Sequence, residues 1–237
     1  MMSDTHSHGD HSHGDHSHGD HGYGDHRHDH AQTVFQEDDR PSFEAELLEL
    51  AVRALLVEKG IVSPDEIRQA IEAMDSRGEE LGARIVARAW VDTDFRSRLI
   101  ASGDEAVREF GIDMRPTELC VVEDTDTVHN MIVCTLCSCY PRPILGIPPA
   151  WYKRKDYRAR AVREPRSVLA EFGTHPEAHK EVRVHDSNAD LRYLVLPQRP
   201  AGTEGWSEAE LARLVTRDSM IGVAPVRDPR SVKAAAE

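Results

Sequence analysis

Long apolar runs and aromatic side chains are scarce in this 237-residue chain. No apolar run approaches the roughly 18 residues that a membrane-spanning helix needs. The N-terminus is polar and rich in histidine, whereas a Sec signal peptide is basic and then apolar, so we expect none. Aromatic residues make up 5% of the chain and charged residues 30%, which is ordinary for a helix-rich, water-soluble protein. We therefore predict a cytoplasmic protein with no membrane partner.

Basic charge and cysteine are scarce as well. The net charge is −13, and residues 1–40 contribute −7 of it because nine acidic side chains face only Arg27 and Arg40. A nucleic-acid-binding protein normally carries a basic face and a matching motif, so we expect no nucleic-acid partner. Only four cysteines are present, and three of them lie within six positions, which excludes a disulfide scaffold.

Residues 1–40 form a tail of low sequence complexity. The segment His6-Ser7-His8-Gly9-Asp10 recurs at 11–15 and 16–20, and the tail holds ten of the fourteen histidines. Such a composition offers little apolar surface to offset the entropy of ordering, so we predict disorder. Clustered imidazoles and carboxylates bind Co, Ni or Zn loosely, which makes the tail a candidate collector of metal. The alternative is a solvated tail that binds metal only incidentally.

Residues 41–115 have the pattern of a helical section. Apolar spacing predicts a helix from Ser42 to Gly60, and Ser63-Pro64-Asp65-Glu66 combines an N-cap, proline at N1 and a capping box for a second helix to Met74. Three further helices are expected over 81–90, 92–100 and 104–110, the last ending at Gly111.

Residues 116–226 change to a mixed pattern. Strands are expected near 119–122, 128–133, 182–185 and 191–196, and helices over 158–172, with a possible break at Pro165, and over 207–215. The proline-rich segment 141–149 is predicted to be rigid and irregular, and residues 227–237 to be loose. The fold class is therefore α+β, a helical section followed by strands with helices packed on them.

Cys134, Cys137 and Cys139 follow directly on a predicted strand. Thiolates at i, i+3 and i+5 on a tight turn can converge on one metal ion, and sulfur suits Zn, Cu(I), Fe–S clusters or a trivalent transition metal. Zinc and Fe–S sites usually take four protein ligands, and the only other cysteine, Cys120, lies fourteen residues upstream in a predicted strand. A structural zinc site stays open as an alternative at this point.

The spacing of Cys137 and Cys139 around Ser138 permits backbone ligation. A metal held by the Cys139 sulfur can also take the amide nitrogen of Cys139, and the Cys137 sulfur can pair with the Ser138 nitrogen in the same way. These four donors form a square plane, Cys134 supplies an axial sulfur, and the sixth position is open, as in a catalytic site. Deprotonating an amide requires a strongly polarising ion, so Co(III) or Fe(III) fits better than Zn(II).

The segment Val133–Pro141 resembles the metal-binding claw of the nitrile hydratase alpha subunit and of the related thiocyanate hydrolase gamma subunit. The resemblance covers roughly residues 42–224 and implies that a layered α-β-β-α domain follows the helical section. It includes the motifs Leu145-Gly146, Trp151-Tyr152-Lys153, Tyr157-Arg158-Ala159-Arg160, Val168–Gly173, Arg192-Tyr193, Arg199–Thr203 and Val215–Asp218.

The resemblance implies one Co³⁺ per subunit instead of iron, because Thr135 stands where the iron enzymes have serine. The ligands would be Cys134, Cys137, Ser138 and Cys139, with Cys137 oxidised to a sulfinate and Cys139 to a sulfenate. By resemblance, Cys137, Ser138 and Cys139 are also the catalytic residues, and nitriles are hydrated to amides. The site would be completed by arginines of a partner beta subunit in a heterodimer or heterotetramer. A metallochaperone is a further possible partner.

Arg142 departs from the nitrile hydratase pattern, which mostly has tryptophan here, and is similar to the Pro-Arg-Pro of thiocyanate hydrolase. A guanidinium in a partly desolvated pocket would favour an anion such as thiocyanate, which is hydrolysed to carbonyl sulfide and ammonia. Arg142 could instead pair with a carboxylate of the partner. Against thiocyanate, residues 118–134 look more like nitrile hydratase. We assign Arg142 and Tyr140 as candidate substrate-binding residues.

Asp186 and Asp190 correspond by resemblance to acidic positions behind the metal ligands, so we expect both to support the site without reacting. His185 and His129 are expected to be structural. The prediction is the alpha subunit of a cobalt nitrile hydratase. The alternatives are a thiocyanate hydrolase gamma-type subunit and, in a different class, a non-catalytic structural protein with a cysteine-bound metal.

Overall fold

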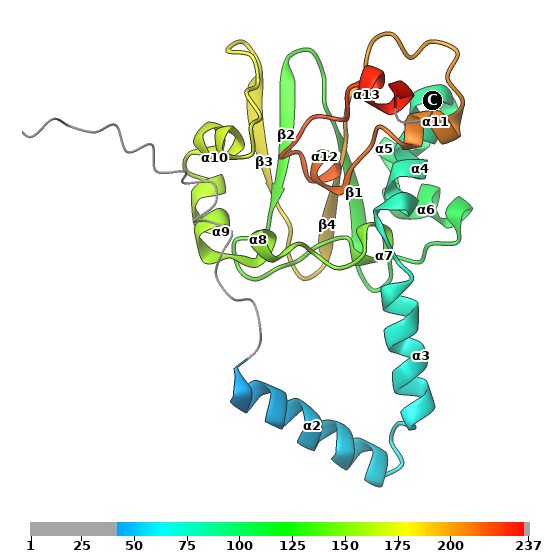
Figure 1. Cartoon of the computed structure of the whole chain (residues 1–237), viewed down its shortest axis with the longest axis vertical. Coiled ribbons are helices and arrows are strands. Elements are labelled where there is room, and N and C mark those ends of the chain that lie inside the picture. Colours follow the sequence, from blue (N-terminus) through cyan, green and yellow to red (C-terminus); the bar gives the residue numbers. More distant parts are fainter. Residues whose placement is uncertain (1–41, 235–237) are drawn as a thin grey trace, which may run out of the picture.

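The computed structural model describes residues 42–234 (Figure 1). The predictions for the histidine-rich tail fall outside these residues. Within the described part no helix has both the length and the apolar character that crossing a membrane requires. The α+β class with a helical section followed by a layered domain is confirmed. The division into domains at residues 40, 115 and 226 stays a prediction.

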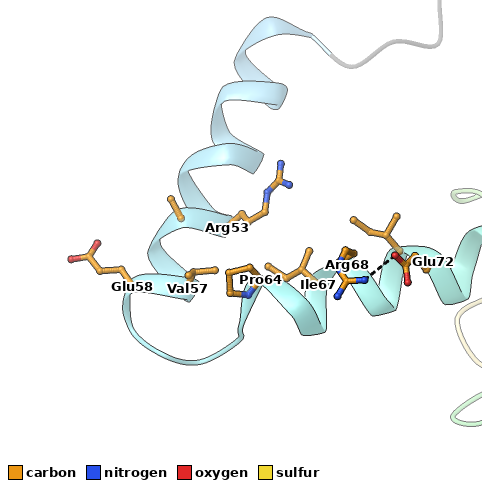
Figure 2. A pocket seen from close by; sticks show the side chains of 9 residues that line it. Arg53, Val57, Glu58, Pro64, Ile67, Arg68 and Glu72 are labelled. Carbon is orange, nitrogen blue, oxygen red and sulfur yellow. Dashed lines mark hydrogen bonds and ion pairs between the residues drawn. The ribbon is translucent and has the colours of Figure 1, made fainter.

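The first two helices form an arm that extends from the body of the molecule (Figure 1). They are α2 (Phe43–Glu58) and α3 (Pro64–Asp75), and none of their residues is buried. Ser63 and Glu66 make the predicted capping box at the start of α3. A groove of about 590 Å³ lies between the two helices and is lined by side chains such as Val57, Ile67 and Ile71 (Figure 2).

The next helices follow the predicted boundaries closely and begin the buried core. They are α4 (Glu79–Val91), α5 (Thr93–Ala101), α6 (Gly103–Val107) and the short 3-10 helix η1 (Arg108–Phe110). Asp92 caps α5 by accepting the N–H groups of Asp94 and Phe95, and Gly111 ends η1 in the left-handed conformation. The stripe of α4 that includes Ile85, Val86 and Ala89 is buried, as the helical spacing predicts.

Four strands pair in parallel across long stretches of sequence. They are β1 (Glu118–Glu123), β2 (Val128–Val133), β3 (Glu181–Asp186) and β4 (Leu191–Leu196). β1 pairs with β4, and β2 pairs with β3. Consecutive strands therefore do not form hairpins, even though only short turns join β1 to β2 and β3 to β4. The carboxyl ends of β2 and β3 consequently lie at the same edge.

Helices cover the strands on both sides (Figure 1). On one side lie α9 (Lys155–Ala161) and α10 (Pro165–Glu171), where Pro165 begins a new helix after the predicted break. On the other side lie α4, α5 and α6. The chain closes with α11 (Glu208–Ala212), α12 (Arg217–Ile221) and α13 (Pro229–Ala234). Gly222 ends α12 with φ 85°, and a Cβ there would lie 1.9 Å from the carbonyl oxygen of Asn130 in β2.

Three expectations are corrected. The segment 141–149 is not wholly irregular, because α7 (Arg142–Leu145) forms with its proline in the first turn, where no N–H is required. A further single turn, α8 (Ala150–Lys153), and the helix α12 were not predicted, since helices of four or five residues show too little periodicity. Part of 227–237 is helical, because α13 packs Val232 against Leu211 and Leu214.

Candidate metal centre

The cysteine loop begins at the edge where two parallel strands end. Cys134 follows Val133, the last residue of β2, and Val133 pairs with Asp186, the last residue of β3. The Ser187 N–H donates to the Val133 carbonyl oxygen at 2.7 Å and extends the pairing by one residue. Since parallel strands finish together, the start of the loop and the end of β3 are held side by side. A loop on such a rigid edge is a common location for a functional site.

The three predicted thiols converge. The Sγ atoms of Cys134 and Cys137 are 3.5 Å apart, those of Cys137 and Cys139 are 3.2 Å apart, and all three lie within 4.8 Å of one another. The Cys137 N–H donates to the Cys134 sulfur at 3.2 Å, which closes a tight turn. Cys134 is buried, Cys139 is partly buried and Cys137 is exposed. Cys120 is not part of this group.

Hydrogen bonds and burial separate the acidities of two thiols. The pKa of Cys137 is lowered to about 7, mainly because the thiols of Cys139 and Cys134 hydrogen-bond to it. The backbone N–H groups of Ser138 and Cys139 also act on the Cys137 sulfur and lower its pKa further. Burial is the main cause that raises the pKa of Cys139 to about 12. Of these two thiols, Cys137 therefore loses its proton more readily. A thiol has to lose its proton before it can bind a metal.

The donor set fits a transition metal. Three sulfurs meet within bonding reach of a common centre, and no imidazole or carboxylate belongs to the group in the described chain. The backbone N–H groups of Ser138 and Cys139, the two predicted nitrogen donors, lower the pKa of the Cys137 thiol. Soft thiolates select transition metals over Mg²⁺ or Ca²⁺, so these residues fit the metal that the sequence predicts.

Asp186 holds the loop from β3. Its Oδ1 accepts the Thr135 N–H at 2.9 Å, and its Oδ2 accepts the Thr135 hydroxyl at 2.6 Å. The Arg158 guanidinium of α9 donates to the Thr135 carbonyl oxygen at 3.4 Å. Asp190 is different, because only its backbone takes part in hydrogen bonds, with Glu118 and Asn188. Of the two predicted supporting acids, the structure brings only Asp186 to the loop.

Two tyrosine hydroxyls hold the cysteine loop and the strand before it by hydrogen bonds to backbone carbonyl oxygens. The sequence did not predict this role. The Tyr152 hydroxyl of α8 donates to the Cys139 carbonyl oxygen at 2.9 Å. The Tyr157 hydroxyl of α9 donates to the Ile132 carbonyl oxygen at 2.6 Å, two residues before Cys134. Tyr152 is fully buried and packs edge-on against Tyr140 and Trp151. Both tyrosines lie in motifs of the family resemblance, Trp151-Tyr152-Lys153 and Tyr157-Arg158-Ala159-Arg160, which did not indicate this role.

A cleft of about 360 Å³ opens beside the thiols. Its walls are residues 114–117, 137–140, 142–143 and Arg192. Arg142, a predicted substrate-binding residue, is exposed and belongs to the wall of this cleft. Tyr140 contributes to the wall, but its hydroxyl is buried without a hydrogen-bond partner among residues 42–234, and burial raises its pKa.

The two histidines near the strands have structural partners. The His185 Nε2 lies 2.8 Å from Asn130 Oδ1, and the His129 Nε2 lies 2.8 Å from the Gly222 carbonyl oxygen. Neither belongs to the group of candidate metal ligands.

Known proteins share this sequence and fold. The family model described as nitrile hydratase, alpha chain, matches residues 43–224. The low-molecular-weight cobalt-containing nitrile hydratase subunit alpha of Rhodococcus rhodochrous is 56% identical over 181 residues, which cover 76% of this chain and 87% of that protein. The thiocyanate hydrolase subunit gamma of Thiobacillus thioparus is 45% identical over 191 residues, covering 76% and 79%. A solved recombinant thiocyanate hydrolase with partially modified cobalt centres is 44% identical and has a TM-score of 0.75, covering 81% of this chain and 92% of that one.

Proposed function

Since the chain belongs to the nitrile hydratase alpha-chain family, we propose that it is the alpha subunit of a cobalt nitrile hydratase, which converts nitriles to amides together with a beta subunit. The observation that carries this proposal is the convergence of three thiols, two of which, Cys137 and Cys139, belong to the wall of an open cleft. A structural zinc site would be closed on all sides, whereas a catalytic site must leave a position for its substrate.

Cys134, Cys137 and Cys139 would hold the metal through sulfur, and Ser138 and Cys139 through their amide nitrogens. A bound trivalent cobalt ion would supply Lewis acidity, which makes a nitrile carbon more open to attack. The ion would also keep the thiols ionised. The relative from Rhodococcus rhodochrous is named as cobalt-containing, which supports cobalt over iron here.

Burial supports the proposed pattern of cysteine oxidation. Cys137 is exposed and Cys139 partly exposed, so an oxidant can reach both sulfurs, whereas Cys134 is 0% exposed. The family resemblance implies a sulfinate at Cys137 and a sulfenate at Cys139, and the burial of Cys134 supports leaving it as a thiolate. The Cys139 sulfenate oxygen, or a water beside it, is the proposed nucleophile toward the nitrile carbon.

The arm formed by α2 and α3 is the proposed docking element for the beta subunit. Phe43, Leu47, Leu48 and Leu50 of α2 are 77%, 57%, 65% and 54% exposed, although such side chains are usually buried. A contiguous apolar surface of this kind marks a protein–protein contact. Relatives are named as subunits, so the partner that covers the arm is proposed to be the beta subunit.

Thiocyanate hydrolysis is the second candidate, and Arg142 favours it. The Arg142 guanidinium forms no ion pair in the described chain and lies in the wall of the cleft with Cys139. An unpaired guanidinium attracts an anion such as thiocyanate and gives nothing to a neutral nitrile.

The test is an assay of the complex co-purified with its beta subunit, on a simple nitrile and on thiocyanate. We expect amide from the nitrile, and we expect Cys137→Ser to abolish this activity. Cys120→Ser is the matched control and should keep it, because Cys120 lies outside the thiol group. Carbonyl sulfide from thiocyanate without any amide from the nitrile would replace the first candidate by the second.

A further inference from the structure

Three arginines from separate parts of the chain meet in the wall of the cleft. Arg115 precedes β1, Arg142 begins α7, and Arg192 lies in β4. The pairing of β1 with β4 sets Arg192 beside Leu119 and so brings it close to the segment that holds Arg115. No aspartate or glutamate belongs to the wall.

Only one of the three guanidinium groups is neutralised by a carboxylate. Arg115 forms a two-pronged ion pair with Asp113, with N···O distances of 2.7 to 3.1 Å. Arg192 donates to the backbone carbonyl oxygens of Asn188 and Leu191, which carry no net charge. Arg142 makes no ion pair within residues 42–234. Arg142 and Arg192 therefore lack a carboxylate partner within residues 42–234.

Arginines that have no carboxylate partner discriminate between neutral and anionic molecules. In a partly desolvated cleft they attract an anion more strongly than in bulk water, and the planar guanidinium matches a carboxylate with two parallel hydrogen bonds. A neutral nitrile gains nothing from these charges. The cleft therefore has a specificity element that hydration of a simple nitrile does not need.

The size of the cleft indicates which anion it suits. A volume of about 360 Å³ has room for about twelve water molecules, since each occupies about 30 Å³ in the liquid. Thiocyanate has only three heavy atoms and would leave most of this space to water. A molecule with a nitrile at one end and a carboxylate at the other can reach the thiols and an arginine together.

We propose that the cleft selects nitriles that carry a carboxylate, and that Arg142 is the main residue that sets this selectivity. Arg115 contributes less, because Asp113 already neutralises it. The inference rests on the proposed function for the reaction at the nitrile end. It adds the chemical class of the substrate and the residues that recognise it.

The experiment compares two substrates of equal length on the complex with the beta subunit. 4-Cyanobutyrate and pentanenitrile differ only in that a carboxylate replaces a methyl group. We expect a higher kcat/KM for 4-cyanobutyrate, and a ratio that falls about fivefold in Arg142→Gln. Arg230→Gln is the matched control, because Arg230 is exposed, pairs with Asp228 and is not in the wall. Its ratio should stay at the wild-type value.

A binding measurement makes the outcome independent of turnover. Calorimetric titration of the same complexes with pentanoate, which has the carboxylate but no nitrile, should show weaker binding in Arg142→Gln and unchanged binding in Arg230→Gln. Equal ratios in wild type and Arg142→Gln, or turnover of thiocyanate but not of 4-cyanobutyrate, would overturn the inference. If neither nitrile is hydrated, the proposed function fails, and the pentanoate titration alone then supports or overturns carboxylate binding by the cleft.

Discussion

Asp186 accepts two hydrogen bonds from Thr135, one from the backbone N–H at 2.9 Å and one from the hydroxyl at 2.6 Å. Thr135 is the first residue after the buried Cys134, and Asp186 is the last residue of β3. One carboxylate therefore ties the start of the metal loop to a strand that lies some fifty residues further along the chain. A rigid supporting contact of this kind orients metal ligands.

Asp186→Asn should loosen this contact. An amide is uncharged, so the bond from the Thr135 N–H weakens, and the Thr135 hydroxyl would have to accept from the amide NH₂ instead of donating to a carboxylate. We expect a loss of about 1 kcal/mol in the free energy of unfolding and a lower affinity for cobalt. Denaturant unfolding and metal titration measure the two effects. Asp190→Asn should change the free energy of unfolding and the affinity for cobalt less, because the Asp190 side chain makes no hydrogen bond in the described chain. An equal effect of the two substitutions would contradict the supporting role of Asp186.

Tyr152→Phe should disturb the loop without disturbing the core. The substitution keeps the buried ring and removes only the hydrogen bond to the Cys139 carbonyl oxygen. We expect a loss of about 1 kcal/mol in the free energy of unfolding and a shift of the sulfur-to-cobalt absorption bands of the complex. Tyr157→Phe removes a similar bond to Ile132 in β2. It should cost similar stability but leave the absorption bands closer to wild type, so equal spectra in the two variants would count against the role of Tyr152.

His185 should make stability depend on pH. Its pKa is lowered, chiefly by burial and then by the positive charge of Arg183. The unfolded chain therefore binds a proton before the folded chain does, and stability falls as the pH drops below the unfolded pKa of about 6.5. We expect His185→Gln to reduce the loss of Tm between pH 7.5 and pH 5.5. His175→Gln, at an exposed position, is the control. A Tm profile for His185→Gln that parallels wild type would remove this explanation.

The arm formed by α2 and α3 should be required for assembly with the beta subunit and not for folding of the rest of the chain. Leu48→Lys places a charge on the exposed apolar surface of α2, where Leu48 is 65% exposed. We expect less beta subunit to co-purify and an unchanged Tm for the isolated chain, because α2 has no buried residue. Val162→Lys changes an apolar side chain outside the arm that is 46% exposed. If both variants assemble equally well, the arm is not the docking element.

Local sequence patterns predicted most helices and strands, because these depend on caps and apolar spacing within a few residues. Ser63 and Ser207 make the capping boxes that their motifs predicted, and Asp92 caps α5. The parallel pairing of β2 with β3 could not be predicted in this way. It depends on contacts between residues about fifty positions apart, and no short motif encodes them. The helix α13 was missed because Val232 is held by distant core residues.

The metal centre was more predictable than its surroundings. The spacing of Cys134, Cys137 and Cys139 required them to be close whatever the fold, and the structure brings their sulfurs together. The contact of Asp186 with the loop was expected from the family resemblance. The hydroxyl of Tyr152 and the grouping of Arg115 with Arg192 depend on tertiary packing, so sequence spacing carried no signal for them.

The metal content of the purified complex tests the central claim most directly. We expect one cobalt per alpha chain in the wild type and in Cys120→Ser, and none in Cys137→Ser, as measured by elemental analysis together with protein concentration. Zinc in place of cobalt, or full cobalt content in Cys137→Ser, would contradict it.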